Sequence, residues 1–270
     1  SLAGRVLRVT AIRDMTDRKR AEAERERLIS ELTARNAEME QFTYTVSHDL
    51  KSPLITINGF LGALEQDLRD GNGERAQSDF RRIRSASAKM SALLDDLLEL
   101  SRVGRIGGVF QTLEMTEVAR DAADLLAGFL DGARVELSIA ADLPKVRGDR
   151  ARLVQVLQNL FENAAKYMGS QPHPRIELGA RTEGKDHVFF VRDNGIGIEP
   201  KYGERIFGLF EKLDQRSAGT GIGLALVRRI IDFHGGRVWV ESDGRNGSTF
   251  LFRLPQATVA PREPEGTAKP

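Results

Sequence analysis

The sequence contains no cysteine among its 270 residues. This absence excludes disulfide bonds, thiolate metal sites and cysteine nucleophiles. No apolar run reaches the roughly 18 residues that a membrane-spanning helix needs, and no signal peptide is evident. The formal net charge is only +1, so neither nucleic-acid binding nor attachment to a membrane surface is indicated. We therefore expect a cytoplasmic chain that contacts neither nucleic acid nor membrane.

The first residues indicate that the chain is a piece of a longer protein. Residues 5–12 alternate loosely between polar and apolar side chains, which is typical of a strand. Residues 14–17 then supply Asp and Thr, which favour the start of a helix. Because the chain opens inside the expected strand, we expect further domains upstream and, in the full-length protein, room for a membrane anchor.

Residues 17–68 predict a long amphipathic helix. Apolar residues recur at steps of three and four, the heptad spacing of a coiled coil, and Arg35 is the polar intruder. The spacing shifts near residues 46–50, which changes the supercoil locally, and Pro53 lies within the pattern, where we expect a kink. The seam comprises Leu28, Leu32, Met39, Phe42, Val46, Leu50, Ile57, Leu61, Leu64 and Leu68.

A second helix is expected from Glu74 to Val103, after a Gly-Asn-Gly turn at residues 71–73. Its apolar residues again have heptad spacing. Two helices joined by a short turn cannot bury both seams alone, whereas two such hairpins can pair. We therefore predict an all-α helical hairpin that forms a dimeric four-helix bundle. The second seam comprises Phe80, Ile83, Ser87, Met90, Leu94, Leu97 and Ser101.

The rest of the chain mixes the helical and the strand period. A glycine-rich linker at 104–109 leads into residues 110–255, and these predict an α+β sandwich in which a mixed sheet carries helices on one face. Residues 256–270 hold several prolines and few large apolar residues, so we expect a disordered tail. The helical patterns lie at 115–130, 149–168 and 222–234, and the strand-like runs lie at 134–140, 174–181, 187–193, 236–242 and 248–254.

The stretch 159–167 (NLFENAAKY) is the first of three motifs that carry chemistry. It places Asn159, Asn163 and Lys166 near one face of a helix. Amide oxygens are hard ligands that suit Mg²⁺, and a lysine suits phosphate. The polar face of an ordinary helix would have the same pattern, so this motif alone leaves both interpretations open.

Two glycine-rich motifs follow. Asp193 comes directly after an apolar run and opens DNGIGI, where its carboxylate can accept a hydrogen bond from an exocyclic amine and the glycines let the backbone approach a flat ring. A simple turn is the alternative. Residues 219–224 (GTGIGL) precede an apolar helix, where backbone N–H groups form an anion site. This last motif also resembles a dinucleotide fingerprint, but no parallel βαβ unit surrounds it.

Taken in order, the three motifs resemble the N box and the two glycine boxes of the nucleotide-binding domain shared by histidine kinases, gyrase, the Hsp90 chaperones and the MutL proteins. Residues 207–210 (FGLF) resemble the phenylalanine box of the kinase branch, and residues 247–250 (GSTF) resemble the closing glycine motif. The resemblance covers residues 110–255 and implies ATP and Mg²⁺ as cofactors.

The resemblance also implies a role for each matching residue. Asn163 would be the Mg²⁺ ligand, supported by Asn159, while Lys166 would contact phosphate, Tyr167 would cover the adenine and Asp193 would hold the adenine amine. Residues around 211–221 would form a mobile lid over the phosphates. The full set of implied nucleotide contacts is Asn159, Asn163, Lys166, Tyr167, Asp193, Gly195, Gly197, Phe210, Gly219, Thr220, Gly221, Gly223, Leu224 and Thr249.

His48 stands out in the first helix, within SHDLKSPL (47–54). It lies midway between the seam residues Val46 and Leu50, and each helical step turns about 100°, so its imidazole should face solvent. An imidazole that is largely neutral near pH 7 is a nucleophile, and Asp49 is the candidate base or orienting group. A lone histidine is more often structural or merely exposed. His173, His187 and His234 are expected to be such surface or packing residues.

The sequence HDLKSPL resembles the histidine box in the dimerisation domain of sensor histidine kinases, and the likeness extends over residues 37–103. It implies that His48 is the autophosphorylation site. The family's phosphatase position, which commonly holds Thr or Asn, holds Ser52 here. Because Ser lacks the methyl group that restricts the rotamers of Thr, we expect phosphatase activity that is present but weak.

Residues 14–17 (DMTD) are similar to the exit of a PAS sensor domain. This likeness implies the end of a sensor domain at 1–16 and a coiled-coil signalling helix at 17–45. The dimerisation and histidine phosphotransfer domain would follow at 37–103, and the catalytic ATP-binding domain at 110–255.

Together these features predict an ATP-dependent protein-histidine kinase of a two-component system. It would act as a homodimer, receive its signal from an upstream sensor domain, and pass the phosphoryl group from His48 to an aspartate of a response regulator. Two alternatives are an ATPase clamp of the same fold and a degenerate kinase that serves as a scaffold. A stable phosphohistidine, formed with labelled ATP, separates the kinase from both.

Overall fold

The computed structural model describes residues 16–103, 108–183, 186–213 and 219–255. The strand expected at 5–12, most of the expected linker and the tail at 256–270 lie outside the described residues. The chain divides into two compact units, residues 1–52 and 53–270, and each is described by itself. In the described ranges, no helix is both long enough and apolar enough to cross a membrane.

Helix α1 (Thr16–Arg69) is one continuous helix of 54 residues, as the heptad pattern predicts. It runs on through Pro53, which removes one main-chain hydrogen bond from the helix interior. In the first unit, the hydroxyls of Thr33, Thr43 and Ser47 each donate to the carbonyl four residues earlier. Serine and threonine are tolerated within a helix when their hydroxyls bond back in this way.

Helix α2 (Gly73–Arg102) completes the predicted hairpin. The turn before it uses Gly71 at φ +72°, a left-handed conformation that glycine adopts without steric cost. The guanidinium of Arg82 on α2 lies 4.8 Å from the centre of the Phe60 ring on the second part of α1. Large apolar side chains remain exposed on the hairpin, among them Leu61, Phe80 and Leu94. Within one chain the seam is therefore only partly covered.

The second part of the chain contains a five-stranded sheet with the order β2-β4-β5-β7-β6. Strand β2 runs parallel to β4, and the other neighbours are antiparallel, which confirms the predicted mixed sheet. A separate two-stranded sheet pairs β1 with β3; it was not predicted. The bounds are β1 Gln111–Glu114, β2 Glu136–Ile139, β3 Lys145–Gly148, β4 Arg175–Glu183, β5 Asp186–Asp193, β6 Arg237–Glu241 and β7 Thr249–Pro255.

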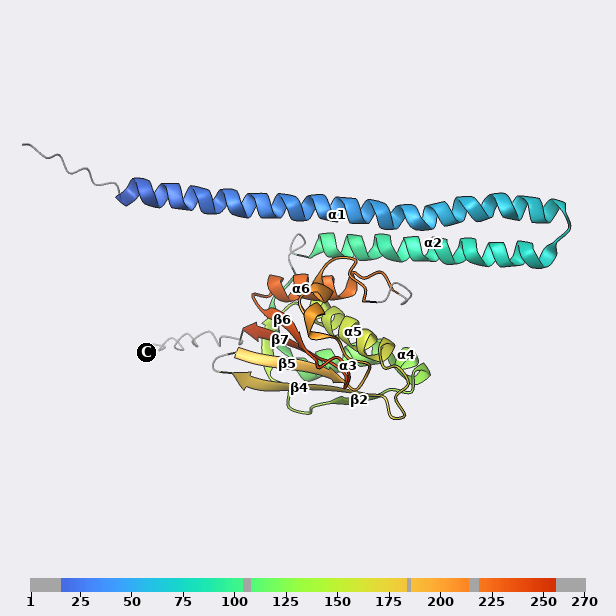
Figure 1. Ribbon diagram of the computed structural model, residues 1–270. Coiled ribbons are helices and arrows are strands. Elements are labelled where there is room, and N and C mark those ends of the chain that lie inside the picture. The colour runs from blue at the N-terminus through green and yellow to red at the C-terminus, as the bar shows by residue number, and fades with distance from the viewer. Residues whose placement is uncertain (1–15, 104–107, 184–185, 214–218, 256–270) are drawn as a thin grey trace, which may run out of the picture. The chain divides into compact units, whose positions relative to one another are not determined.

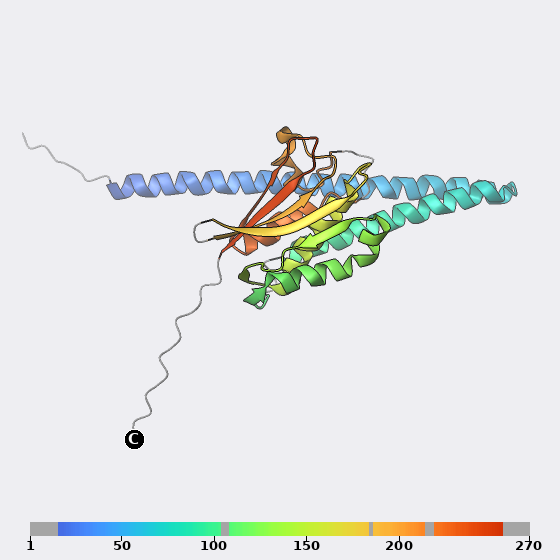
Figure 2. The ribbon, with the colours of Figure 1, turned by 90° about the horizontal axis from the view of Figure 1, so that it is seen from below.

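The helices of this domain lie on one side of the large sheet, as Figures 1 and 2 show. The helix predicted at 115–130 is divided, because Leu126 leaves helical geometry at φ −105° and ψ 3°. Between helices and sheet, Phe161, Phe189 and Phe252 are fully buried. The helices are α3 Met115–Leu125, α4 Ala127–Gly132, α5 Arg150–Lys166 and α6 Gly223–Phe233, with the 3-10 turns η1 Pro200–Tyr202 and η2 Arg205–Phe207.

The start of α5 is fixed by a histidine from the end of α6. The main-chain N–H of Asp149 donates to Nε2 of His234 (3.0 Å), and Nδ1 of His234 donates to the carbonyl of Ile230 (2.7 Å). The carboxylate of Asp149 in turn accepts the N–H of Arg152 as the helix cap (3.3 Å), one of the bonds that satisfy the free donors of a first helical turn. His234 is thus the packing residue that the sequence predicts, and it holds the helix that carries the first motif.

Candidate functional site

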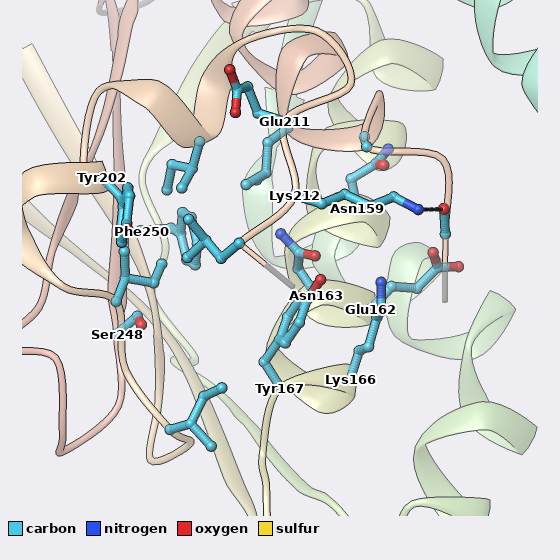
Figure 3. Close-up of a pocket in the computed structure, with 18 of the residues that line it drawn as sticks. Asn159, Glu162, Asn163, Lys166, Tyr167, Tyr202, Glu211, Lys212, Ser248 and Phe250 are labelled. Carbon is cyan, nitrogen blue, oxygen red and sulfur yellow. Dashed lines mark hydrogen bonds between the residues drawn. The ribbon is translucent and has the colours of Figure 1, made fainter. Parts of the chain in front are cut away.

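A cavity of about 660 Å³ opens between α5, the loop that follows β5, the start of α6 and the start of β7. Figure 3 shows its two walls: Asn159, Glu162, Asn163 and Lys166 project from α5 on one side, and Tyr202, Ser248 and Phe250 lie on the other. A cavity of this size accommodates a ligand as large as a nucleotide.

The polar face of α5 points into this cavity, as the first motif predicts. The Nδ2 amide of Asn159 donates to the carbonyl of Gln155 (2.8 Å), which turns its Oδ1 toward the start of α6. A Cβ atom at Gly223 would lie 2.5 Å from that oxygen. Glycine at the first residue of α6 therefore leaves room for the side chain of Asn159 beside the cavity.

Asp193, at the end of β5, is buried beside the cavity with 7% of its surface exposed. Its Oδ1 accepts two main-chain N–H groups, from Gly195 (2.8 Å) and Ser248 (3.2 Å). Burial raises the pKa of Asp193, and these two hydrogen bonds act in the opposite direction. Because both bonds go to Oδ1, Oδ2 remains for a ligand, and a carboxylate oxygen in this position can accept a hydrogen bond from an exocyclic amine.

Two of the motif glycines are required by the close approach of other backbone segments. Gly221 has φ +79°, and a Cβ there would lie 2.9 Å from the carbonyl carbon of Phe210. Gly247 has φ +88°, and a Cβ there would lie 2.1 Å from the carbonyl oxygen of Asp193. Both conformations belong to the left-handed region that favours glycine. Glycine at these two positions therefore allows the neighbouring backbone segments beside the cavity to pack closely.

Most of the residues that the sequence singled out line this one cavity, although they come from distant parts of the chain. Gly195, Phe210 and Thr249 do not. Thr249 does not line the cavity because side chains alternate along a strand. Its neighbours Ser248 and Phe250 face the cavity, so Thr249 faces away from it. The expected residues that do line it are Asn159, Asn163, Lys166, Tyr167, Asp193, Gly197, Gly219, Thr220, Gly221, Gly223 and Leu224.

Further polar residues that were not predicted also line the cavity, among them Asp96, Glu162 and Tyr202. Glu162 lies inside the first motif, and the helical period alone could have placed it beside the cavity. Its pKa is raised by burial and then by the charge of Asp96, while Lys166 acts to lower it. No sequence pattern connects Asp96 on α2 with the second domain, so only the folded chain reveals it.

The donor atoms at the cavity fit a magnesium nucleotide. No group of three or more His, Asp or Glu side chains with metal-binding geometry occurs in the described part of the chain. Mg²⁺ commonly keeps waters and substrate phosphates as ligands and takes only one or two from the protein. The amide oxygen of Asn163 can supply one such ligand, with Lys166 beside it for phosphate.

His48 lies on α1 in the first unit, with 70% of its side chain exposed. Its Nδ1 is 2.9 Å from Oδ1 of Asp49. When that nitrogen carries the proton and donates it to the carboxylate, Nε2 keeps its lone pair and points to solvent. The predicted exposure of His48 is confirmed, and the geometry is that of an oriented nucleophile.

Two family models match the chain. The "His Kinase A (phospho-acceptor) domain" matches residues 38–106, and the "Histidine kinase-, DNA gyrase B-, and HSP90-like ATPase" matches residues 148–258. The first therefore contains His48, and the second contains the three cavity motifs.

A curated relative is similar over most of the chain: the methanogenesis regulatory histidine kinase FilI of Methanothrix harundinacea, 49% identical over 90% of the chain. The chain spans 27% of that protein, and less than a third of each of several further relatives.

Solved structures also match. Full-length ShkA in complex with AMPPNP has a TM-score of 0.57 at 28% identity, over 82% of the chain and 46% of ShkA. The histidine kinase ThkA in complex with the response regulator protein TrrA has a TM-score of 0.64 at 23% identity, over 92% of the chain and 68% of ThkA, and shows the same fold.

Proposed function

We propose that this chain, which belongs to the sensor histidine kinases, uses ATP to phosphorylate its own His48 and then passes the phosphoryl group to an aspartate of a response regulator. The observation that carries the proposal is the state of His48. It is an exposed imidazole on the phospho-acceptor domain, with Nδ1 held by Asp49 and Nε2 directed to solvent.

The chemical step follows from that geometry. The lone pair of Nε2 attacks the γ-phosphorus of ATP, a P–N bond forms, and the bond from phosphorus to the leaving oxygen of ADP breaks. The ring becomes positively charged as the bond forms. Asp49 stabilises that charge and accepts the proton of Nδ1, so that a neutral phosphoimidazole remains.

The cavity residues bind and orient the nucleotide. Oδ2 of Asp193 would accept the adenine amine, Tyr167 would cover the ring, and Lys166 would hold phosphate. Asn163 would ligate Mg²⁺, which supplies neutralisation of the developing charge on the β- and γ-phosphates. Because phosphoryl transfer depends chiefly on positioning and charge, these residues would make up the second domain's part of the reaction.

The partners are inferred from the same two domains. The open apolar seam of the hairpin supports a homodimer, and the phosphohistidine would serve a response regulator, the kind of protein with which ThkA is crystallised. Sensing would belong to a domain upstream of α1, and ATP as the substrate supports a cytoplasmic location. The weak phosphatase activity expected for Ser52, which is exposed one helical turn after His48, stays a prediction.

The test is incubation with ATP labelled at the γ-phosphate. We expect a label on the protein that is labile in acid and stable in base, lost at least a hundredfold in His48→Gln, with unchanged ATP affinity because the acceptor and the cavity lie on separate domains. His173→Gln, at another exposed histidine, is the matched control and should label normally. ATP hydrolysis without any phosphohistidine would instead favour an ATPase clamp.

A further inference from the structure

The side chain of Asn194 forms two hydrogen bonds outside the cavity. Its Oδ1 accepts the main-chain N–H of Arg175 (2.8 Å), and its Nδ2 donates to the carbonyl of His173 (2.8 Å). A side-chain amide carries both an acceptor and a donor, as a peptide group does, so Asn194 extends the pairing of β4 with β5 past Asp193, the last residue of β5. Because Asn194 does not line the cavity, it can act on a bound nucleotide only through other residues.

These two bonds hold one end of the loop that joins α5 to β4, residues 167–174. The other end of this loop is Tyr167, which lines the cavity (Figure 3). The carbonyl of Tyr167 accepts the main-chain N–H of Ile196 (3.0 Å). Gly195 lies between the two attachments, and a Cβ atom there would lie 2.4 Å from the same carbonyl oxygen. The glycine motif after β5 therefore binds both ends of the loop.

The far end of this motif is anchored separately by Ser242, which follows β6. Its Oγ accepts the main-chain N–H of Ile198 (2.9 Å) and donates to the carbonyl of Gly247 (2.7 Å). The carboxylate of Asp193 has two main-chain donors of its own. Loss of the Asn194 amide should therefore release the loop between α5 and β4 while Asp193 stays in place.

Recognition of adenine requires Tyr167 and Asp193 in a fixed relation. Tyr167 would set the plane of the ring that it covers, and Asp193 would accept the amine that lies in that plane. Ring contacts tolerate offsets, whereas a hydrogen bond weakens steeply once it departs far from linear. A displaced Tyr167 should therefore weaken the bond to the amine more than it weakens the other contacts of the nucleotide.

We propose that Asn194 is a positioning residue for base selection. It holds the loop of residues 167–174 against the end of β5 and so fixes Tyr167 relative to Asp193. The inference rests on the proposed function of the cavity as an ATP site. Asn194 thereby sets how strongly the cavity prefers a purine with an amine, although it touches no part of the nucleotide.

The first test is calorimetric titration of ATP and of inosine triphosphate, each with Mg²⁺, into the whole chain carrying Asn194→Ala. The affinity for ATP should fall roughly fivefold, and that for inosine triphosphate, which lacks the amine, less than about twofold. A merely structural loss of folded protein would lower the binding stoichiometry of both nucleotides and leave the ratio of the two affinities unchanged.

The matched control is Asn246→Ala. The amide of Asn246 bonds to Asp243 within its own loop, and the main-chain bonds of that loop to Asp243 remain. Both affinities should stay within about twofold of wild type.

An unchanged ratio in Asn194→Ala, while wild type prefers ATP to inosine triphosphate, overturns the inference and leaves the proposed function intact. A wild type that binds the two nucleotides equally well has no base selection, and this result also overturns the role of Asn194. A wild-type chain that binds no ATP overturns the proposed function as well.

The second test is a double-mutant cycle with Asp193→Asn. Two residues that act through one interaction have effects that do not add. In the Asp193→Asn protein the bond to the amine is already lost, so a further Asn194→Ala change should alter ATP affinity less than about twofold. A further loss of about fivefold would show that Asn194 does not act through Asp193 and would contradict the inference.

Discussion

The helical hairpin and the nucleotide domain treat their apolar residues in opposite ways. On the hairpin, Leu32 is 66% exposed, Leu68 is 65% exposed and Phe80 is 56% exposed, whereas Phe161 and Phe189 in the nucleotide domain are fully buried. The nucleotide domain completes its core within one chain. The hairpin has a seam that only another surface can cover, and each large apolar side chain that is buried contributes about 1.5–3 kcal/mol.

This difference separates assembly from nucleotide binding. The stability of the hairpin should depend on protein concentration, as it does for any fold that requires a partner chain, while that of the nucleotide domain should not. Changes at the apolar seam should therefore leave nucleotide binding intact, changes at the α5 side of the cavity should leave assembly intact, and the variants below test that separation.

The largest effect is expected for Asn163→Asp, which should abolish ATP binding without affecting assembly. The change would replace the neutral amide oxygen that we propose as a Mg²⁺ ligand by a charge next to Glu162, whose pKa is raised by burial and then by the charge of Asp96. We expect at least a hundredfold loss of affinity in a calorimetric titration with Mg²⁺ and ATP, and an unchanged dimer in analytical ultracentrifugation.

The matched control for this change is Asn58→Asp, at an exposed position of the hairpin. It introduces the same charge and should bind ATP as wild type does. Equal affinity of Asn163→Asp and wild type would remove Asn163 from the metal site.

The reverse separation is expected for Leu94→Glu on the seam of α2. Leu94 is 45% exposed in the single chain, and a glutamate there would bury a charge at the dimer contact, at a cost of about 2 kcal/mol. The dimer dissociation constant should rise roughly thirtyfold, with ATP affinity unchanged. Ala92→Glu, exposed two residues earlier and off the seam, is the control; equal dimerisation of the two variants would contradict the assignment of the seam.

Asp193→Asn should change which base the cavity prefers. An amide can present a donor where only an acceptor fits the adenine amine, so ATP affinity should fall about tenfold, while inosine triphosphate, which has an oxygen in place of that amine, should lose little. Asp232→Asn, at an exposed position of α6, is the control. The same loss for both nucleotides would show that Asp193 acts only on the local fold.

The sequence predicts much of both regions, because their signals are local. The heptad spacing gave the two helices of the hairpin to within one or two residues, and the alternation of apolar residues found all five strands of the large sheet. The exposure of His48 followed from its place between Val46 and Leu50. Short motifs in which glycine adopts a positive φ, such as Gly221, can likewise be recognised in the sequence.

The parts that were missed depend on contacts between distant segments. The small sheet of β1 and β3 pairs two strands of four residues that lie some thirty residues apart, and Asp96 reaches the cavity only because α2 docks on the second domain. Thr249 does not line the cavity, whereas its neighbours Ser248 and Phe250 do, and its expected nucleotide contact stays a prediction. Local patterns specify elements, whereas the docking of elements requires the fold.

The smallest expected effect concerns His234 and the pH dependence of the nucleotide domain alone. Burial is the main cause that lowers the pKa of His234 below its usual 6.5. Protonation of the ring would also remove the acceptor that its Nε2 provides for the N–H of Asp149.

Below about pH 6.5 the unfolded chain binds this proton and the folded chain resists it, so the free energy of unfolding should decrease as the pH falls from 7 toward 5. Losing that one hydrogen bond is worth about 1 kcal/mol. His234→Gln keeps an oxygen acceptor but cannot titrate, and its melting temperature should decline less steeply over this range than that of wild type. His173→Gln, at an exposed histidine, should keep the wild-type slope. Identical slopes for all three proteins would show that His234 does not link folding of the nucleotide domain to pH. Dimerisation through the seam that contains Leu94 should be the same in both histidine variants as in wild type.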